Sequence, residues 1–120
     1  MKMIVCVVND PDRVQDVLTA LLEVGITTAT VIESQGMGRV VTEQMPIFAG
    51  FRNLWSGARP YNKTIFTVVD DEKAEEAMHA LRDAMFGGRQ DARGAKGVLF
   101  TVPVLDFYKS TGSGQGETER

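Results

Sequence analysis

The sequence predicts an α+β domain in which two helices cover one face of an antiparallel sheet. Four segments have the apolar runs or the alternation typical of strands, and apolar residues follow the 3.6-residue period of helices in two others. Acidic helix-start signals precede both helical segments. The 120 residues, 43% hydrophobic and 24% charged, have the size and composition of one globular domain with a real but small core.

The first third of the chain supplies two strands and the helix between them. The apolar run at residues 3–8 predicts the first strand. Asp10 is expected to cap a helix that begins with Pro11, and Gly25 is expected to end it in a left-handed conformation. Residues 26–33 alternate and are rich in Thr, Val and Ile, which predicts the second strand. The apolar residues of the helix recur at helical spacing, at Val14, Val17, Leu18, Leu21 and Leu22.

The second half supplies the remaining strands and helix. Residues 64–69 and 98–102 predict the third and fourth strands, and Asp70 begins the acidic start of a helix between them. The apolar stripe of that helix is Ala74, Ala77, Met78, Leu81 and Met85. The resulting order, βαββαβ, is the ferredoxin-like pattern, a sandwich with both helices on one face of the sheet.

The segment 34–62 shows no regular period, so we expect a long loop there. Glycines and prolines interrupt it, at Gly36, Gly38, Pro46, Gly50, Gly57 and Pro60. Such long loops are uncommon inside a compact domain and are usually functional or disordered. We expect the domain to occupy residues 1–109, with this insertion at about 36–61, and the low-complexity residues 110–120 to form a disordered tail.

The third and fourth predicted strands are apolar on both faces. Ile65 and Val69 point opposite to Phe66 and Val68, and Leu99 points opposite to its apolar neighbours. Because the helices of this fold cover only one face, the other face requires a cover. A symmetric oligomer that packs sheet against sheet would supply it.

Charge and composition exclude several classes of partner and chemistry. A net charge of −3 and a pI near 5.1 give no basic surface for nucleic acid or anionic lipid. The apolar run at the N-terminus is too short for a signal peptide or a membrane span. Cys6 is the only cysteine, so no intrachain disulfide forms, and a reducing, cytoplasmic location is expected. One Cys and one histidine, His79, make no metal-ligand set and no nucleophile–base pair, so we expect no enzyme.

Residues 20–39, Ala-Leu-Leu-Glu-Val-Gly-Ile-Thr-Thr-Ala-Thr-Val-Ile-Glu-Ser-Gln-Gly-Met-Gly-Arg, closely resemble a run in the nitrogen regulatory P-II proteins, without a gap. The resemblance continues through residues 68–71 and 100–104 and covers most of the chain except the middle of the long loop and the tail. It implies a homotrimer that binds ATP or ADP in clefts between subunits. It also implies that the long loop, the T-loop of this family, docks on a membrane transporter, a metabolic enzyme or another regulator.

The resemblance also implies which residues contact the nucleotide. Thr30, Gly36, Gly38 and Arg39 match family positions along the nucleotide, and Met37 lies between the two glycines. Glycine at such positions lets backbone amides approach an anion. Lys109 is what remains of a basic C-terminal pair in the family, and Lys63, or its neighbour Asn62, replaces a basic residue before the third strand.

The phosphate-side loop departs from the family pattern Gly-Asp-Gly-Lys. Here Gly97 retains the last glycine, and Val98 takes the place of the lysine. Arg89, Arg93 and Lys96 lie close by in sequence and are candidates to supply the missing positive charge. The altered loop leaves open a second hypothesis, in which a P-II-like trimer senses a different small ligand: a cyclic dinucleotide, AMP or bicarbonate.

The middle of the long loop is more apolar than the usual T-loop and lacks the tyrosine that is often modified there. Its candidate partner-binding residues are Ile47, Phe48, Phe51, Leu54 and Trp55. Two interpretations are equally supported: these side chains fold back on the domain as a local cluster, or they bind a partner protein.

Overall fold

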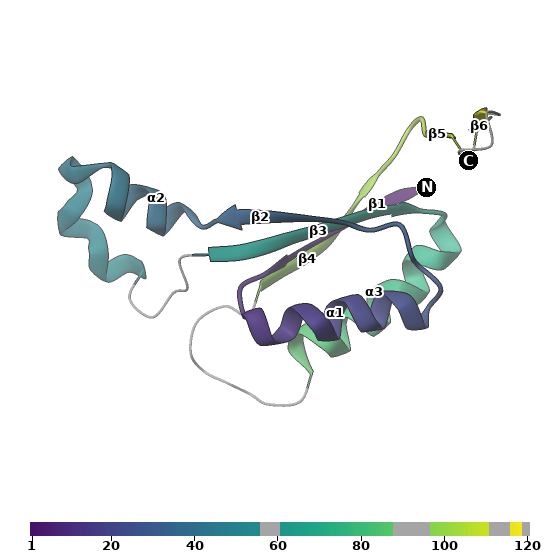
Figure 1. Ribbon diagram of the computed structural model, residues 1–120, viewed down its shortest axis with the longest axis horizontal. Coiled ribbons are helices and arrows are strands. Elements are labelled where there is room, and N and C mark those ends of the chain that lie inside the picture. The colour runs from purple at the N-terminus through teal and green to yellow at the C-terminus, as the bar shows by residue number, and fades with distance from the viewer. Residues whose placement is uncertain (56–60, 88–96, 111–115, 119–120) are drawn as a thin grey trace.

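The computed structural model describes residues 1–55, 61–87, 97–110 and 116–118. Within these ranges β1 (Lys2–Val8), β2 (Thr30–Gln35), β3 (Tyr61–Val69) and β4 (Gly97–Pro103) form one antiparallel sheet in the order β2-β3-β1-β4. The helices α1 (Pro11–Glu23) and α3 (Asp71–Phe86) both lie against the same face of this sheet (Figure 1). This is the predicted ferredoxin-like arrangement. Within the described ranges, no helix has the length and hydropathy needed to cross a membrane.

The helix boundaries follow the local signals in the sequence. The Asp10 side chain caps α1 by accepting a hydrogen bond from the Asp12 amide at 2.9 Å, and Asp70 caps α3 by accepting one from the Lys73 amide at 2.8 Å. Gly25 follows α1 with φ of +85°, a conformation that favours glycine. The predicted starts of both helices and the end of the first are therefore confirmed.

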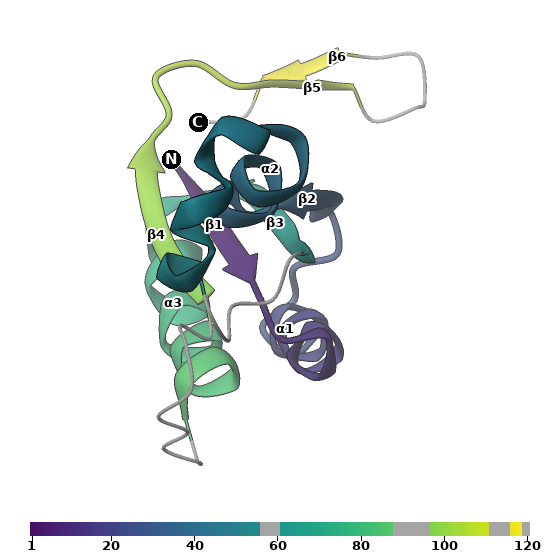
Figure 2. The ribbon, with the colours of Figure 1, turned by 90° about the vertical axis from the view of Figure 1, so that its left-hand side faces the viewer.

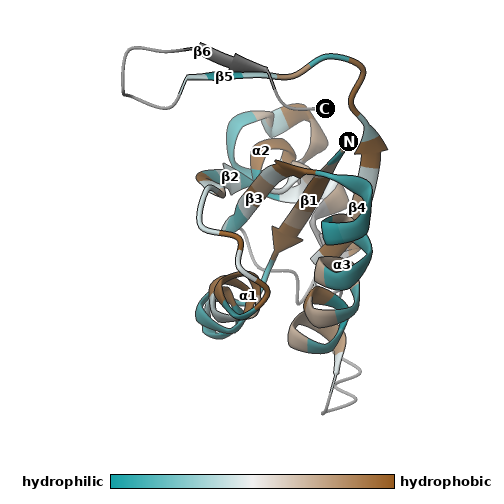
Figure 3. Cartoon of the chain, turned by 90° about the vertical axis from the view of Figure 1, so that its right-hand side faces the viewer, coloured by the Kyte–Doolittle hydropathy of each residue, from teal (hydrophilic) through white to brown (hydrophobic). Residues whose placement is uncertain are grey.

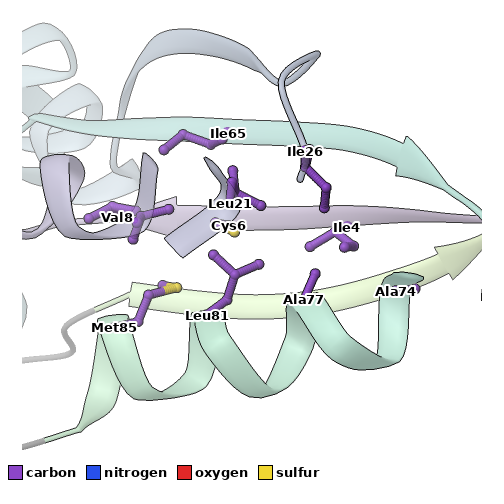
Figure 4. Packing of buried hydrophobic residues seen from close by; sticks show 11 residues of the cluster. Ile4, Cys6, Val8, Leu21, Ile26, Ile65, Ala74, Ala77, Leu81 and Met85 are labelled. Atoms are coloured by element: carbon purple, nitrogen blue, oxygen red, sulfur yellow. The ribbon is translucent and has the colours of Figure 1, made fainter. Parts of the chain in front are cut away.

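The hydrophobic core lies between the helices and the sheet. Its largest fully buried side chains come from both layers: Ile4, Cys6, Val8, Val17, Ile65, Leu81 and Met85 (Figure 4). The strand β1 is hydrophobic along most of its length, whereas α1 and α3 each carry hydrophobic and hydrophilic residues (Figure 3). Among the apolar residues at helical spacing on α1, Leu22 is 61% exposed, because it lies beside the buried stripe of the helix rather than in it.

The second strand begins later than the alternation predicts. Residues 26–29 precede β2, and Ile26 is buried in the core although it lies in the connection after Gly25. The Ile26 amide donates a hydrogen bond to the Leu21 carbonyl at 2.8 Å, which turns the chain back onto the end of α1. Its apolar character therefore reflects packing on the helix and not strand pairing.

The expectation of an irregular loop over residues 34–62 is wrong for the part that the structure describes. β2 runs to Gln35 and β3 begins at Tyr61, and between them lie α2 (Met37–Gln44) and a 3-10 helix, η1 (Pro46–Trp55). Gly36 is the N-cap of α2 and Pro46 is the first residue of η1, so both stand at the start of a helix. The segment of α2 and η1 extends beyond the end of the sheet (Figures 1 and 2).

The C-terminal part also carries some regular structure. β5 (Tyr108–Ser110) pairs with β6 (Gly116–Thr118) in a two-stranded antiparallel sheet, where the sequence predicts a disordered tail. This hairpin projects from the body of the molecule above the sheet (Figure 2).

Candidate functional site

Part of the predicted nucleotide site gathers at one end of the main sheet. Val8 at the end of β1 pairs with Lys63 of β3 and with Gly97 of β4, and Gln35 at the end of β2 pairs with Tyr61. The sheet therefore brings Gly36–Arg39, Lys63 and Gly97 to the same end, with Gly36–Arg39 following one edge strand and Gly97 on the other. Arg89, Arg93 and Lys96 lie outside the described residues.

Gly36 and Gly38 form the entrance to α2. Gly36, the N-cap, makes no side-chain cap, and a Cβ built on it would meet nothing within 4 Å. Gly38 is buried, and its carbonyl accepts a hydrogen bond from the Thr42 hydroxyl at 2.7 Å. Met37 between them is 72% exposed. The N-cap Gly36 thus leaves the backbone open at the positive end of a helix, where an anion is stabilised.

Arg39 is the positively charged residue in the first turn of α2. Its guanidinium donates to the Gln35 side-chain oxygen at 2.7 Å, lies 3.1 Å from a carboxylate oxygen of Glu43, and stacks on the Tyr61 ring at 4.5 Å from the centroid. No local sequence pattern identifies Glu43 and Tyr61 as partners of Arg39. The spacing of Arg39 and Glu43, four residues apart, becomes a signal only once this segment is recognised as a helix.

Gly97 has a structural reason to be glycine that is independent of any ligand. Its φ is +148°, and a Cβ there would lie 2.1 Å from the Val7 carbonyl oxygen. Real Cβ atoms do not approach a backbone oxygen this closely, so the start of β4 can pack on β1 only without a side chain at this position.

Lys63 forms an ion pair across the sheet with Glu33, at 2.8 Å. The hydrogen bond from the Lys63 ammonium lowers the pKa of Glu33 below its usual value. Lys63 lines a cavity of about 300 Å³ with Val8, Val14 and Tyr61.

The other two predicted contacts lie at the opposite end of the sheet. Thr30 and Lys109 line a cavity of about 820 Å³, together with Thr27, Thr28 and Lys73. A strand rises about 3.3 Å per residue, so β2 places Thr30 roughly 17 Å from Gln35 at the other end. Within one chain the predicted nucleotide contacts that the structure describes therefore form two groups and not one site.

The candidate partner-binding residues lie on the α2–η1 segment. Ile47 and Leu54 are 83% and 72% exposed, and the Phe48 and Phe51 rings contact each other at 5.9 Å between centroids. The side chain of Trp55 lies outside the described part of the chain. The contact between the two rings is a feature of a local cluster, and the apolar side chains in solvent are a feature of a partner-binding surface. The structure therefore leaves both interpretations of this segment open.

No group of three or more His, Cys, Asp or Glu side chains within the described ranges is placed to bind a metal ion. His79 is exposed on α3, as its place on the polar side of the helix predicts.

Comparison with known proteins agrees with this fold. A model of the family "Nitrogen regulatory protein P-II" matches residues 1–113. Among solved structures, the PII protein of Arabidopsis thaliana bound to citrate is similar, with a TM-score of 0.65 and 20% sequence identity over 97% of this chain and 87% of that chain. A direct comparison with curated protein sequences finds no match. Because the family model spans nearly the whole described chain and the architecture is shared, this protein belongs to the nitrogen regulatory protein P-II family.

Proposed function

We propose that this protein is a nucleotide-sensing regulator. In this proposal it forms a homotrimer, binds ATP or ADP in clefts between subunits, and controls a membrane transporter or a metabolic enzyme in the cytoplasm through its α2–η1 segment. Nitrogen metabolism is the process that family membership suggests. The protein acts by contact with its target and not by catalysis.

The observation that carries the proposal is the position of the candidate anion-binding residues. Gly36 is the N-cap of α2, and Gly38 and Arg39 are in its first turn, so they belong to the helix that begins the exposed segment. A phosphate group held there contacts the segment directly. A ligand that binds one orientation of the segment better than another shifts its population by that difference in affinity.

The division of the predicted contacts between two ends of the sheet supports a site made by two subunits. Thr30 and Lys109 are separated from Arg39 and Gly97 by the length of β2 and β4. A nucleotide that touches both groups needs the Thr30 end of one subunit to meet the Arg39 end of another. The open apolar face of the sheet supplies a surface for such an assembly.

The experiment is a titration of the full chain with ATP, ADP and AMP. Calorimetry measures binding, and tryptophan fluorescence measures the response of the segment. Trp55 is the only tryptophan, so its emission reports on the α2–η1 segment without engineering. We expect at least one nucleotide to bind and to shift the emission maximum. Absence of binding by all three would refute nucleotide sensing, and binding with unchanged emission would refute the control of the segment.

A further inference from the structure

The guanidinium of Arg39 is held by residues from three elements. Gln35 is the last residue of β2, Glu43 lies one turn further along α2, and Tyr61 is the first residue of β3. The α2–η1 segment leaves the sheet after Gln35 and returns to it at Tyr61. Arg39 therefore connects the first helix of the segment to both strands from which the segment projects.

These contacts fix the position of the Arg39 side chain but leave one of its N–H donors without an acceptor among the described residues. The Arg39 side chain is only 17% exposed, and its Nε is buried with no hydrogen-bond partner among the described residues. A buried donor without an acceptor is destabilising, and most native structures avoid it. The guanidinium thus retains a donor for an acceptor that the described part of the chain does not supply.

Glu43 is the contact most easily displaced. Its side chain is 55% exposed, and its bond to Arg39 is an ion pair between residues four apart on a short helix. Exposed pairs of this kind contribute little to stability, because water screens them and both side chains lose rotamer freedom. The stacking of Arg39 on Tyr61 does not depend on this carboxylate.

We infer that Glu43 sets the affinity and the charge preference of the Arg39 anion site by occupying the guanidinium in place of a ligand phosphate. The inference rests on the proposed nucleotide binding at this site. Carboxylate and phosphate oxygens bind the same fork of guanidinium N–H groups, so they compete. A ligand with more negative charge at this end displaces Glu43 more readily, which favours ATP and ADP over AMP.

Displacement of Glu43 has a consequence for the α2–η1 segment. While the ion pair is intact, it joins two successive turns of α2 and holds Arg39 between Gln35 and Tyr61. When a phosphate takes the guanidinium, the Glu43 carboxylate returns to solvent, and this link within α2 is lost. Glu43 thus opposes ligand binding and connects occupancy of the site to the helix that begins the segment.

The test is Glu43→Gln, which retains the size and helix propensity of the side chain and removes its charge. The probes are ATP, ADP and AMP, with affinity measured by calorimetry on the full chain. We expect ATP to bind about two- to fivefold more tightly to the variant, the range that an exposed ion pair supports, and AMP to change less. Asp16→Asn is the matched control, because Asp16 pairs with Arg13 on α1 at 4.0 Å and lies outside the site.

A second variant separates competition from a general change of charge. In the Arg39→Gln background, Glu43→Gln should no longer raise the affinity for ATP, because no guanidinium remains to be released. Equal gains in both backgrounds would overturn the competition.

The remaining outcomes distinguish the two proposals. If wild type binds ATP and Glu43→Gln binds it equally or more weakly, the role of Glu43 is overturned and nucleotide binding stands. If only Glu43→Gln binds ATP, the role of Glu43 is supported in its strongest form. If neither binds any of the three nucleotides, both proposals are overturned together.

Discussion

Gly36 and Gly97 have different reasons to lack a side chain, although the sequence gives both the same role. At Gly36 the backbone is extended, with φ of −73°, and a Cβ would meet open space, so the fold itself tolerates a side chain there. At Gly97 a Cβ would collide with the Val7 carbonyl. Only at Gly36 does the absence of a side chain leave room that a ligand can use.

The thiol of Cys6 gives a prediction on pH dependence. Burial raises the pKa of Cys6 to about 12, whereas the pKa of a thiol in an unfolded chain is about 8.5. Above that pH the unfolded chain releases the proton and the folded chain keeps it. The unfolded state then binds fewer protons, so the free energy of unfolding falls as the pH rises between the two values.

Urea unfolding at pH 8 and pH 10 measures this effect. The loss of stability between the two pH values should be about 1–2 kcal/mol larger in wild type than in Cys6→Ala, which lacks the titrating group. The comparison of the two losses cancels both the cavity made by the substitution and the titration of other groups. An equal loss in the two proteins would show that the thiol is not shielded from water.

At the scale of elements, α2 is the clearest departure from the sequence prediction. The glycines and prolines of residues 34–62 indicate a loop when they are counted together. Their positions are more informative: none lies between Gly38 and Pro46, and that interval contains the Arg39–Glu43 pair. Val41 also buries its side chain on this helix.

The α2–η1 segment is expected to be dispensable for folding. α2 makes its main contacts with η1, and none of its side chains belongs to the core cluster between the helices and the sheet. Deletion of residues 40–58 should therefore change the melting temperature by less than about 5 °C, as a change of 1 kcal/mol or less does in a domain of this size.

Leu81→Ala is the comparison for this deletion. Leu81 is fully buried in the core, and its truncation should cost about 2–5 kcal/mol. Differential scanning calorimetry measures both proteins. A deletion that destabilises as much as Leu81→Ala would show that the segment is part of the folding unit.

For the whole molecule, the sheet face away from the helices is the surface expected to pack against another subunit. Cross-strand pairing places Val5 opposite both Phe66 and Phe100, and Val7 opposite Val98, on the face away from the helices. Val98 and Phe100 are 52% and 42% exposed there, and no described element covers them. The sequence prediction of a sheet that is apolar on both faces is confirmed.

Phe100→Lys is expected to break the proposed trimer and leave the monomer folded. A charge on the open face would be buried without a partner in a sheet-to-sheet interface, whereas in a monomer it stays in water. Size-exclusion chromatography with light scattering should show a trimer for wild type and a monomer for the variant at micromolar concentration, with the circular dichroism spectrum unchanged.

Leu22→Lys is the matched control for assembly. Leu22 is an exposed apolar residue on α1, on the helix-covered side of the sheet, so a charge there should leave the trimer intact. A wild-type chain that is monomeric at these concentrations would refute the trimer. Loss of assembly in Leu22→Lys but not in Phe100→Lys would locate the interface away from the open sheet face.

The parts of this protein that can be predicted from the sequence are those that depend on neighbouring residues. The cap at Asp10, the left-handed Gly25 and the apolar runs of β1 and β4 each involve residues close together in the chain, so they predict α1 and the sheet, and with them the P-II fold. The apolar character of both sheet faces follows from the same runs, because successive side chains of a strand point to opposite faces.

The surroundings of the candidate site depend on contacts between residues far apart in the chain. Tyr61 meets Arg39 because β2 and β3 pair in one register, and Gly97 meets the Val7 carbonyl because β4 pairs with β1. The division of Thr30 and Arg39 between two ends of the sheet has the same origin. These contacts join residues far apart in the chain, and no local pattern specifies them, since the register depends on how all the strands pack at once.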